Sequence, residues 1–203
     1  MKLYLAPGAC SLAPHIALHE AGLPFDTEGV DLRETPHRTE GGADYTMINP
    51  KGYVPALEFD HGDVLTECAA ILQFIADQAP EMRLAPPNGT LERYRLQEWL
   101  NFISAELHKG FGPMWDPSAR DDMREAAWAR ISRRLDWIAP QLAERDYLMG
   151  DFSVADAYLY TILNWTHYHK LPLDKWPALQ DFMARMAARP AVQQALREEG
   201  LLQ

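Results

Sequence analysis

Cys10 is the first residue whose type and position could support chemistry. It follows a predicted strand at 2–5 and the turn residues 6–9, and a helix is predicted to begin near Ser11. A helix N-terminus presents unpaired backbone N–H groups and the positive end of the helix dipole, which together favour a sulfur anion. The dipole contributes only about 0.3 to 1 kcal/mol, so ionising a thiol would need further donors. The alternative interpretation is a small buried core residue, and position alone does not decide between the two.

A second candidate group lies in the middle of the chain. Asn101, Ser104, Ala105 and His108 follow one another at i, i+3, i+4 and i+7, which places them on one stripe of a predicted helix. A histidine on such a stripe can donate a hydrogen bond to an anion. Because Gly110 follows closely, an ordinary solvated or capping histidine near a helix end is the alternative.

Glu67 and Cys68 open another predicted helix directly after a short strand. Exposed N–H groups at that position could bind a carboxylate, although a glutamate in a first turn is also ordinary helix electrostatics. Cys10 and Cys68 are the two cysteines of the chain. They form neither a disulfide framework nor a C-x-x-C pair, which argues against a dithiol oxidoreductase.

Charge and composition narrow the classes of partner. The 203-residue chain has a formal net charge of -10, which repels phosphate backbones and disfavours nucleic acid as a partner. Its apolar runs are too short for a membrane span and its first residues break too early for a signal peptide, so we expect a cytoplasmic protein with no membrane partner. The seven histidines show no H-E-x-x-H motif or other ligand pair, and we expect no metal site.

The elements that must position these residues differ between the two halves of the chain. Short strands are predicted at 2–5, 25–32, 54–59 and 64–65, the last two joined by a tight turn. Helices are predicted from Ser11 to Ala21, where Ser11 would cap the start, and from Thr66 to before Pro80. The order is β-α-β-loop-β-β-α, with a parallel first pair and an antiparallel second pair.

Residues 80–89 contain three prolines and read as a linker. Everything after them has helical spacing of apolar residues, and Ser153 to Asp156 has the form of a capping box that starts a helix. We therefore predict two domains, an α/β domain at 1–80 and an all-helical domain at 88–203.

Several longer motifs, in order along the chain, resemble the bacterial beta-class glutathione S-transferases. Residues 1–15 are similar to that class's opening signature, and residues 49–57, Asn-Pro-Lys-Gly-Tyr-Val-Pro-Ala-Leu, are similar to its next motif. Further matches are Leu-Thr-Glu at 65–67, Glu-Leu-His-Lys-Gly-Phe at 106–111 and Phe-Ser-Val-Ala-Asp-Ala-Tyr at 152–158. The resemblance covers nearly the whole chain, and several ordered motifs are more specific than any single one.

The resemblance implies an α/β thioredoxin-like N-terminal domain, built from βαβ and ββα parts, joined to an all-α C-terminal helical bundle. The implied activity is that of a glutathione transferase, which conjugates the glutathione thiolate to hydrophobic electrophiles in detoxification. Glutathione would be the co-substrate, bound at the domain boundary of a homodimer. The identity of the electrophile stays open.

The resemblance also implies roles for particular residues. Val54 and Pro55 match a strand start with a cis proline, which exposes the backbone that pairs with the cysteinyl part of glutathione in such proteins. Glu67 and Cys68 match the pair that receives the γ-glutamyl end, although the family more often has Ser or Gly at the place of Cys68. The residues expected to bind glutathione are Cys10, Ser11, His37, Tyr53, Val54, Pro55, Glu67, Cys68, Asn101, Ala105, Glu106, His108 and Lys109.

Two further assignments follow from the same resemblance. The basic residue that meets the glycine carboxylate falls at His37 or Arg38, because the loop at 33–44 is somewhat longer than in typical members. An apolar pocket for the electrophile is expected at four aromatic residues, which could equally belong to the core. These residues are Phe111, Trp115, Tyr158 and Trp165.

The expected mechanism assigns catalysis to His108 and Cys10. A free thiol with a pKa of about 8.5 is only slightly ionised at neutral pH, so backbone N–H groups at the first helix, aided by His108, would hold the glutathione thiolate. Cys10 would be a neighbour, because two thiolates side by side repel each other, or would form a mixed disulfide with glutathione. The alternatives are a disulfide reductase or peroxidase that uses Cys10 as its nucleophile, and a non-catalytic glutathione-binding or ligand-binding protein.

Overall fold

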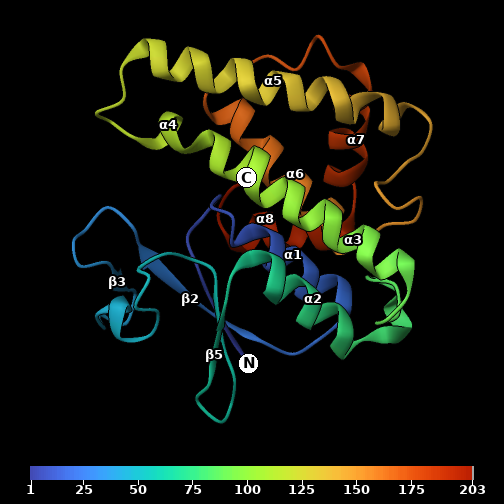
Figure 1. Cartoon of the computed structure of the whole chain (residues 1–203). Helices are drawn as coiled ribbons and strands as arrows, with labels where there is room; N and C mark the ends of the chain where they lie inside the picture. Colours follow the sequence, from blue (N-terminus) through green and yellow to red (C-terminus); the bar gives the residue numbers. More distant parts are fainter. Residues whose placement is uncertain (203) are drawn as a thin grey trace. The chain divides into compact units, whose positions relative to one another are not determined.

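The structure, a computed structural model, describes residues 1–202 and is drawn in Figure 1. Its internal packing divides the chain into two compact units. Unit 1 consists of Met1–Ala85 together with the chain from Ala188 onward, and unit 2 is Pro86–Ala187. The division into domains at 1–80 and 88–203 stays a prediction. In the structure, the last helix of the chain packs as part of unit 1 and not of unit 2.

Unit 1 contains a five-stranded mixed sheet with the strand order β3-β2-β1-β4-β5. The strands are β1 (Lys2–Leu5), β2 (Asp26–Asp31), β3 (Arg38–Thr39), β4 (Ala56–Glu58) and β5 (Val64–Thr66). β1 runs parallel to β2, and β4 and β5 form an antiparallel hairpin, as predicted. The prediction of four strands missed β3, because two residues inside a polar loop carry no alternating pattern. β3 pairs antiparallel with the end of β2.

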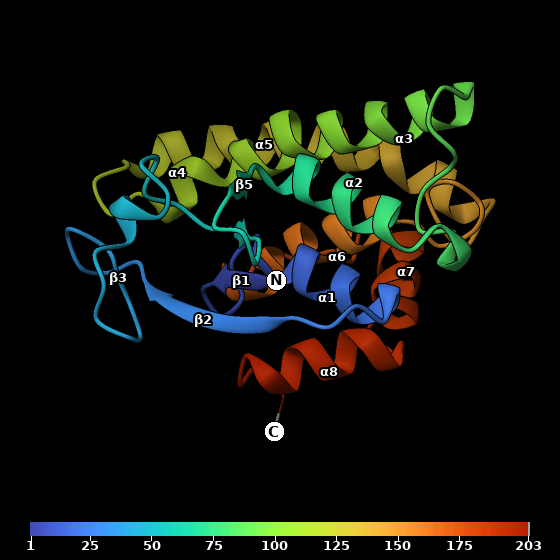
Figure 2. The same ribbon diagram turned by 90° about the horizontal axis from the view of Figure 1, so that it is seen from below.

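The helices of unit 1 pack around α1 (Leu12–Ala21), whose residues from Leu12 to Leu18 are all buried. α2 (Cys68–Gln78) and α8 (Pro190–Glu198) both pack against α1, and Figure 2 shows α8 running alongside it. Gly22 ends α1 in a left-handed conformation with φ 65°, where glycine has no steric cost, as the sequence predicted. Two short 3₁₀ helices, Tyr45–Met47 and Pro80–Met82, complete unit 1.

Unit 2 is helical throughout, as the apolar spacing predicted. It contains α3 (Leu91–Phe102), the π-helical turn η3 (Ile103–His108), the 3₁₀ turn η4 (Lys109–Phe111), α4 (Gly112–Trp115), α5 (Asp121–Ala143), α6 (Val154–Tyr168) and α7 (Pro177–Ala187). Ile131, Leu135 and Ile138 on α5 are fully buried at the predicted spacing. No helix within residues 1–202 combines the length and the hydropathy needed to cross a membrane.

Several side-chain hydrogen bonds hold the start of α6. Ser153 precedes the helix, and its backbone N–H and hydroxyl each donate to Oδ2 of Asp156 at 2.9 Å. The other carboxylate oxygen accepts the backbone N–H of Leu148 at 2.8 Å. The predicted capping box is confirmed, and it also ties the preceding loop to the helix.

Candidate functional site

Cys10 lies in the turn between β1 and α1, where its side chain is buried. Its thiol donates to the carbonyl oxygen of Val54 at 3.2 Å. Val54 stands just before β4, and its peptide bond to Pro55 is cis, as expected from the resemblance. The thiol of Cys68, at the first position of α2, donates to the carbonyl oxygen of Cys10 at 3.6 Å. Tertiary packing therefore brings three separate chain segments to the start of α1.

Ser11 does not cap α1 with its side chain, and that part of the prediction was wrong. Ser11 already has helical dihedral angles, φ -63° and ψ -18°, whereas a capping side chain needs an extended backbone to reach the N–H groups of the first turn. Its hydroxyl instead accepts the N–H of Ala6 at 3.1 Å and donates to the carbonyl oxygen of Ala6 at 3.2 Å. The hydroxyl thereby closes the turn that holds Cys10.

Glu67 connects β5 to α2 with a positive φ of 75°, an unusual conformation for a residue with a side chain. Its carboxylate accepts the hydroxyl of Tyr53 at 2.8 Å and the ammonium group of Lys51, which also donates to Thr66 at 2.8 Å. The hydrogen bond to Glu67 raises the pKa of Lys51 and also that of Tyr53. A strained backbone of this kind costs about 1 to 3 kcal/mol and is characteristic of binding sites.

Lys51 is a residue that the sequence analysis missed. It belongs to the motif at 49–57, but the analysis assigned contacts only to its neighbours Tyr53, Val54 and Pro55. The signal that could have found it is charge: Lys51 is the cation of the motif at 49–57, Glu67 is the anion of the motif at 65–67, and the structure joins the two side chains.

His37 and Arg38, the two candidates for the glycine carboxylate, occupy different surroundings. The ring of His37 lies beside Gly52, whose added Cβ would be 3.9 Å from the histidine Cδ2 atom. Its Nδ1 atom is 2.7 Å from the carbonyl oxygen of Glu34. Arg38 instead donates to the carbonyl oxygen of Gly42 at 3.0 Å, within its own loop. The surroundings favour His37, because it borders the segment that contains Tyr53 and Val54.

The candidate residues of unit 2 do not share the predicted α-helical stripe. α3 ends at Phe102, and the chain continues as the π-helical turn Ile103–His108. A π turn contains more residues than an α turn, so the i, i+3, i+4 and i+7 spacing no longer selects one face. The amide of Asn101 donates to the carbonyl oxygen of Gln97 at 2.9 Å, and the carboxylate of Glu106 accepts Arg134 at 2.7 Å. Ala105 and Lys109 are exposed.

His108 ends the π turn and is half-buried. Its Nδ1 atom is 2.7 Å from the hydroxyl oxygen of Tyr158, a buried residue of α6. The ring of Trp165 packs edge-on against the imidazole, with ring centroids 5.0 Å apart. These two contacts fix the orientation of the ring. Rare π turns often occur at functional sites, which is consistent with the role expected for His108.

Three of the four residues expected to line an apolar pocket pack together within unit 2, and the fourth, Tyr158, contacts His108, which in turn contacts Trp165. Trp165 packs against Phe111 and Trp115 with ring centroids 5.5 and 5.3 Å apart. Phe111, Tyr158 and Trp165 are buried, whereas Trp115 is 43% exposed. The first three therefore contribute to the core of unit 2. A pocket for the electrophile at these residues stays a prediction, and Trp115 is the one of the four whose side chain reaches the surface.

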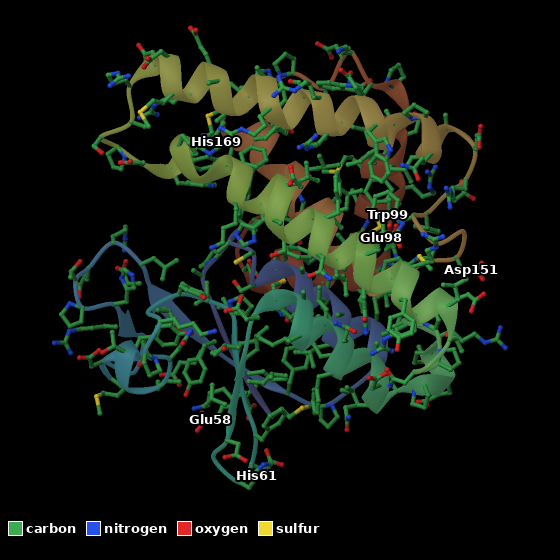
Figure 3. The ribbon with its side chains drawn as sticks, viewed as in Figure 1. Glu58, His61, Glu98, Trp99, Asp151 and His169 are labelled. Atoms are coloured by element: carbon green, nitrogen blue, oxygen red, sulfur yellow. The ribbon has the colours of Figure 1, made fainter. Side chains whose placement is uncertain are left out.

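His169 joins this aromatic group, and the sequence analysis missed it. It follows α6, as labelled in Figure 3, and its ring centroid is 4.4 Å from that of Trp115. Its Nε2 atom is buried and has no hydrogen-bond partner among residues 1–202. Burial lowers the pKa of His169, and the nearby charge of Arg124 lowers it further. No motif marks this histidine, because its contacts come from the packing of α6.

The matches to known families define the class of protein. Residues 8–78 match the glutathione S-transferase N-terminal domain, and residues 102–190 match the glutathione S-transferase C-terminal domain. Glutathione S-transferase GstA of Escherichia coli O157:H7 is 45% identical over 99% of this chain and 100% of that protein. The chain therefore belongs to the glutathione S-transferase family. The predicted architecture and the prediction of a glutathione S-transferase enzyme are confirmed.

Solved structures narrow this assignment to the bacterial beta class. The beta-class glutathione S-transferase of Sphingomonas chungbukensis is 45% identical, with a TM-score of 0.95, and the match covers 100% of both chains. A sphingomonad glutathione S-transferase, solved in complex with glutathione, is 47% identical with a TM-score of 0.94 over 99% of this chain and 100% of that one. The resemblance to the beta class is confirmed.

Proposed function

We propose that this chain conjugates the thiol of glutathione to hydrophobic electrophiles and that it serves in detoxification. The observation that carries this proposal is the pair of contacts in unit 1 that join Cys10 to Val54 and to Cys68, because the three residues come from three chain segments that resemble the beta class. The similar sphingomonad enzyme was solved with glutathione bound, which supports the same ligand here. We further propose a homodimer in the cytoplasm, in keeping with the family resemblance.

The proposed glutathione contacts begin at the backbone of Val54. Its carbonyl oxygen accepts the thiol of Cys10, and a carbonyl has two lone pairs, so it can also accept the cysteinyl N–H of glutathione. An extended peptide that pairs with a backbone segment in this way gains affinity from main-chain hydrogen bonds. Glu67 and Cys68 would receive the γ-glutamyl end, whose ammonium group suits the Glu67 carboxylate.

The remaining contacts are proposed on the same grounds. We assign the glycine carboxylate to His37, with Lys51 as an additional cation, because both lie on segments adjoining Tyr53. The assignments that rest on the family resemblance are Ser11, Tyr53, Pro55, Asn101, Ala105, Glu106 and Lys109. The pocket residues Phe111, Trp115, Tyr158 and Trp165 remain proposed neighbours of the electrophile.

The proposed reaction requires a stabilised thiolate. A free thiol with a pKa of about 8.5 is mostly protonated at neutral pH, and donors aimed at the sulfur favour its anion. The backbone N–H groups at the start of α1 and the imidazole of His108 are the donors that we propose, as the family resemblance implies. The thiol of Cys10 donates to a carbonyl and is thus a neutral neighbour, which avoids the repulsion between two thiolates. The thiolate then attacks the electrophilic carbon, and the leaving group departs with the bonding electron pair.

Calorimetric titration with glutathione tests the binding proposal. We expect binding of one glutathione per chain, and Glu67→Gln should weaken it by about tenfold, because a charge-assisted hydrogen bond to the γ-glutamyl ammonium is worth about 1.5 to 3 kcal/mol. Glu58→Gln is the matched control, since Glu58 accepts the hydroxyl of Tyr4 at 2.7 Å within the sheet. Equal affinity in wild type and Glu67→Gln would remove Glu67 from the site.

Cys10→Ala separates conjugation from thiol-disulfide chemistry. Because Cys10 is proposed as a neighbour, the variant should keep conjugation of an activated aryl chloride within about tenfold of wild type, whereas reduction of a glutathione mixed disulfide should disappear. The two rates are measured on the same preparation. Loss of both activities together would instead make Cys10 the nucleophile of the main reaction.

A further inference from the structure

Two histidines of α1 and a glutamate of α8 converge within unit 1. His15 and His19 are four residues apart on one face of α1, and their ring centroids are 5.1 Å apart. The Nε2 atom of each ring is 2.8 Å from the same oxygen, Oε2 of Glu198. One donor atom from each of the three side chains lies within 4.8 Å of the other two. The expectation that the histidines contain no ligand pair missed this i, i+4 pair, and its third member is distant in the sequence.

The buried histidine of the group is held by a second carboxylate. The Nδ1 atom of His15 is 2.9 Å from Oε1 of Glu199, and the other oxygen of Glu199 accepts the N–H of Gly8 at 2.8 Å. The side chains of His15 and Glu199 are 1% and 0% exposed, so their positions are set by packing. A carboxylate behind the distal nitrogen of a metal-binding histidine fixes the ring and strengthens it as a ligand. The tautomer needed for an Nε2 ligand is thereby imposed on His15.

We propose that Nε2 of His15, Nε2 of His19 and the carboxylate of Glu198 bind a divalent transition-metal ion, with zinc as the best match. Two histidines and one carboxylate form an established donor set for zinc that leaves a fourth position open. Bond lengths of about 2.0 to 2.1 Å in a tetrahedron separate the donor atoms by about 3.3 Å. The Oε2 atom of Glu198 is 2.8 Å from each histidine Nε2 atom, and all three donor atoms lie within 4.8 Å of one another, so side-chain rotation suffices to reach that spacing.

The site also has an entry path. The side chain of Glu198 is 42% exposed and that of His19 is 12% exposed, whereas His15 is 1% exposed, so an ion can reach the group from the side of Glu198. The second oxygen of Glu198 accepts Gln194 at 3.0 Å, which orients the carboxylate. This group contains none of the residues proposed above for glutathione, so the metal site and the proposed conjugation can fail independently.

A second charged pair, Arg189 and Glu20, also joins α1 to the start of α8. The guanidinium group of Arg189 at the start of α8 donates to both oxygens of Glu20 on α1, at 2.6 and 2.9 Å. Glu20 is therefore engaged by its own cation, and the groups that face the proposed ion are the two histidines, Glu198 and Glu199.

Zinc titration of the untagged, full-length protein against a chromophoric chelator tests the proposal. We expect one zinc ion per chain, and at least about tenfold weaker binding in His19→Ala and in Glu198→Gln. Glu199→Gln should weaken binding by about 10-fold to 100-fold, because Glu199 only positions His15. His61→Ala is the control: His61 sits at the tip of the β4–β5 hairpin in Figure 3, with Nε2 3.2 Å from Asp63, and it should bind as wild type.

A further readout distinguishes a built site from surface binding. Cobalt, used in place of zinc, should give the intense visible absorption of a four-coordinate ion, and His19→Ala, whose side chain lies at the rim of the site, should lose it. The proposal is overturned if wild type takes up no stoichiometric zinc, or if His61→Ala weakens binding as much as His19→Ala does.

Discussion

His108→Ala is expected to lower kcat/KM for conjugation about 100-fold at neutral pH, the typical cost of removing one donor aimed at a developing anion. The imidazole is positioned by the hydroxyl of Tyr158 and the ring of Trp165, so the variant removes a donor whose place is fixed by the core of unit 2. Without it, the pKa of bound glutathione should return toward about 8.5, and the deficit should shrink as the pH rises. Steady-state rates with an activated aryl chloride across pH measure both effects.

Two companion variants sharpen this test. Tyr158→Phe keeps the aromatic packing but removes the partner of Nδ1, and a loss of about tenfold is expected, because the ring is then less firmly oriented. His167→Ala changes an exposed histidine of the neighbouring helix α6 and should leave the rates unaltered. A pH profile in His108→Ala that superimposes on that of wild type would exclude His108 from thiolate stabilisation.

Asp156→Ala is expected to lower the free energy of unfolding by about 3 kcal/mol at neutral pH. The substitution leaves the N–H of Leu148 and the N–H and hydroxyl of Ser153 without their buried acceptor, at about 1 to 3 kcal/mol each. The variant also gains some stability, because it no longer has a buried carboxyl that must ionise. Burial raises the pKa of Asp156 to about 6, so ionisation of the carboxyl in the folded chain costs about 3 kcal/mol, which the variant recovers. The lost hydrogen bonds outweigh the recovered cost.

The sign of the pH dependence follows from the raised pKa. Between about pH 4 and pH 6 the folded chain binds a proton that the unfolded chain, with a carboxyl pKa of about 3.9, has lost, so this carboxyl adds stability that is lost as the pH rises through about 6. Destabilisation by Asp156→Ala should therefore be about 1 kcal/mol larger near pH 5 than near pH 7. Urea denaturation at both values measures it. Ser153→Ala, which removes the hydroxyl alone, should lower the free energy of unfolding by about 1 kcal/mol. Equal losses of stability in Ser153→Ala and Asp156→Ala would contradict the central role of the Asp156 carboxylate.

Most secondary structure could be predicted because its signals are local. Gly22 marks the end of α1, Pro177 opens α7, and the Ser153–Asp156 spacing places the start of α6. Each of these residues acts on the backbone within a few positions of itself, and so its effect is visible in a short window of sequence. β3 and the π turn were missed for the converse reason. β3 exists through its pairing with β2, and the π turn differs from an α turn only in its hydrogen-bond register.

Some residues of the candidate site could be recognised from local sequence motifs, and others only from the tertiary structure. Cys10, Val54 and Glu67 could be singled out from ordered motifs, and the structure places Cys10 and Val54 in contact. Lys51 was missed because its role depends on a side-chain contact with Glu67 across sixteen positions. His169 was missed because only the packing of α6 buries its Nε2 atom among aromatic rings.

By itself, the sequence determined the class of this protein: two halves of different periodicity, strand and helix limits, and an ordered set of motifs shared with the beta class. Only the tertiary structure decided which side chains meet. His15 and Glu198 are 183 positions apart, yet α8 packs on α1 and brings their atoms to 2.8 Å. Periodicity tells which face of a helix is buried, but the partner that covers the face is selected by the packing of the whole unit.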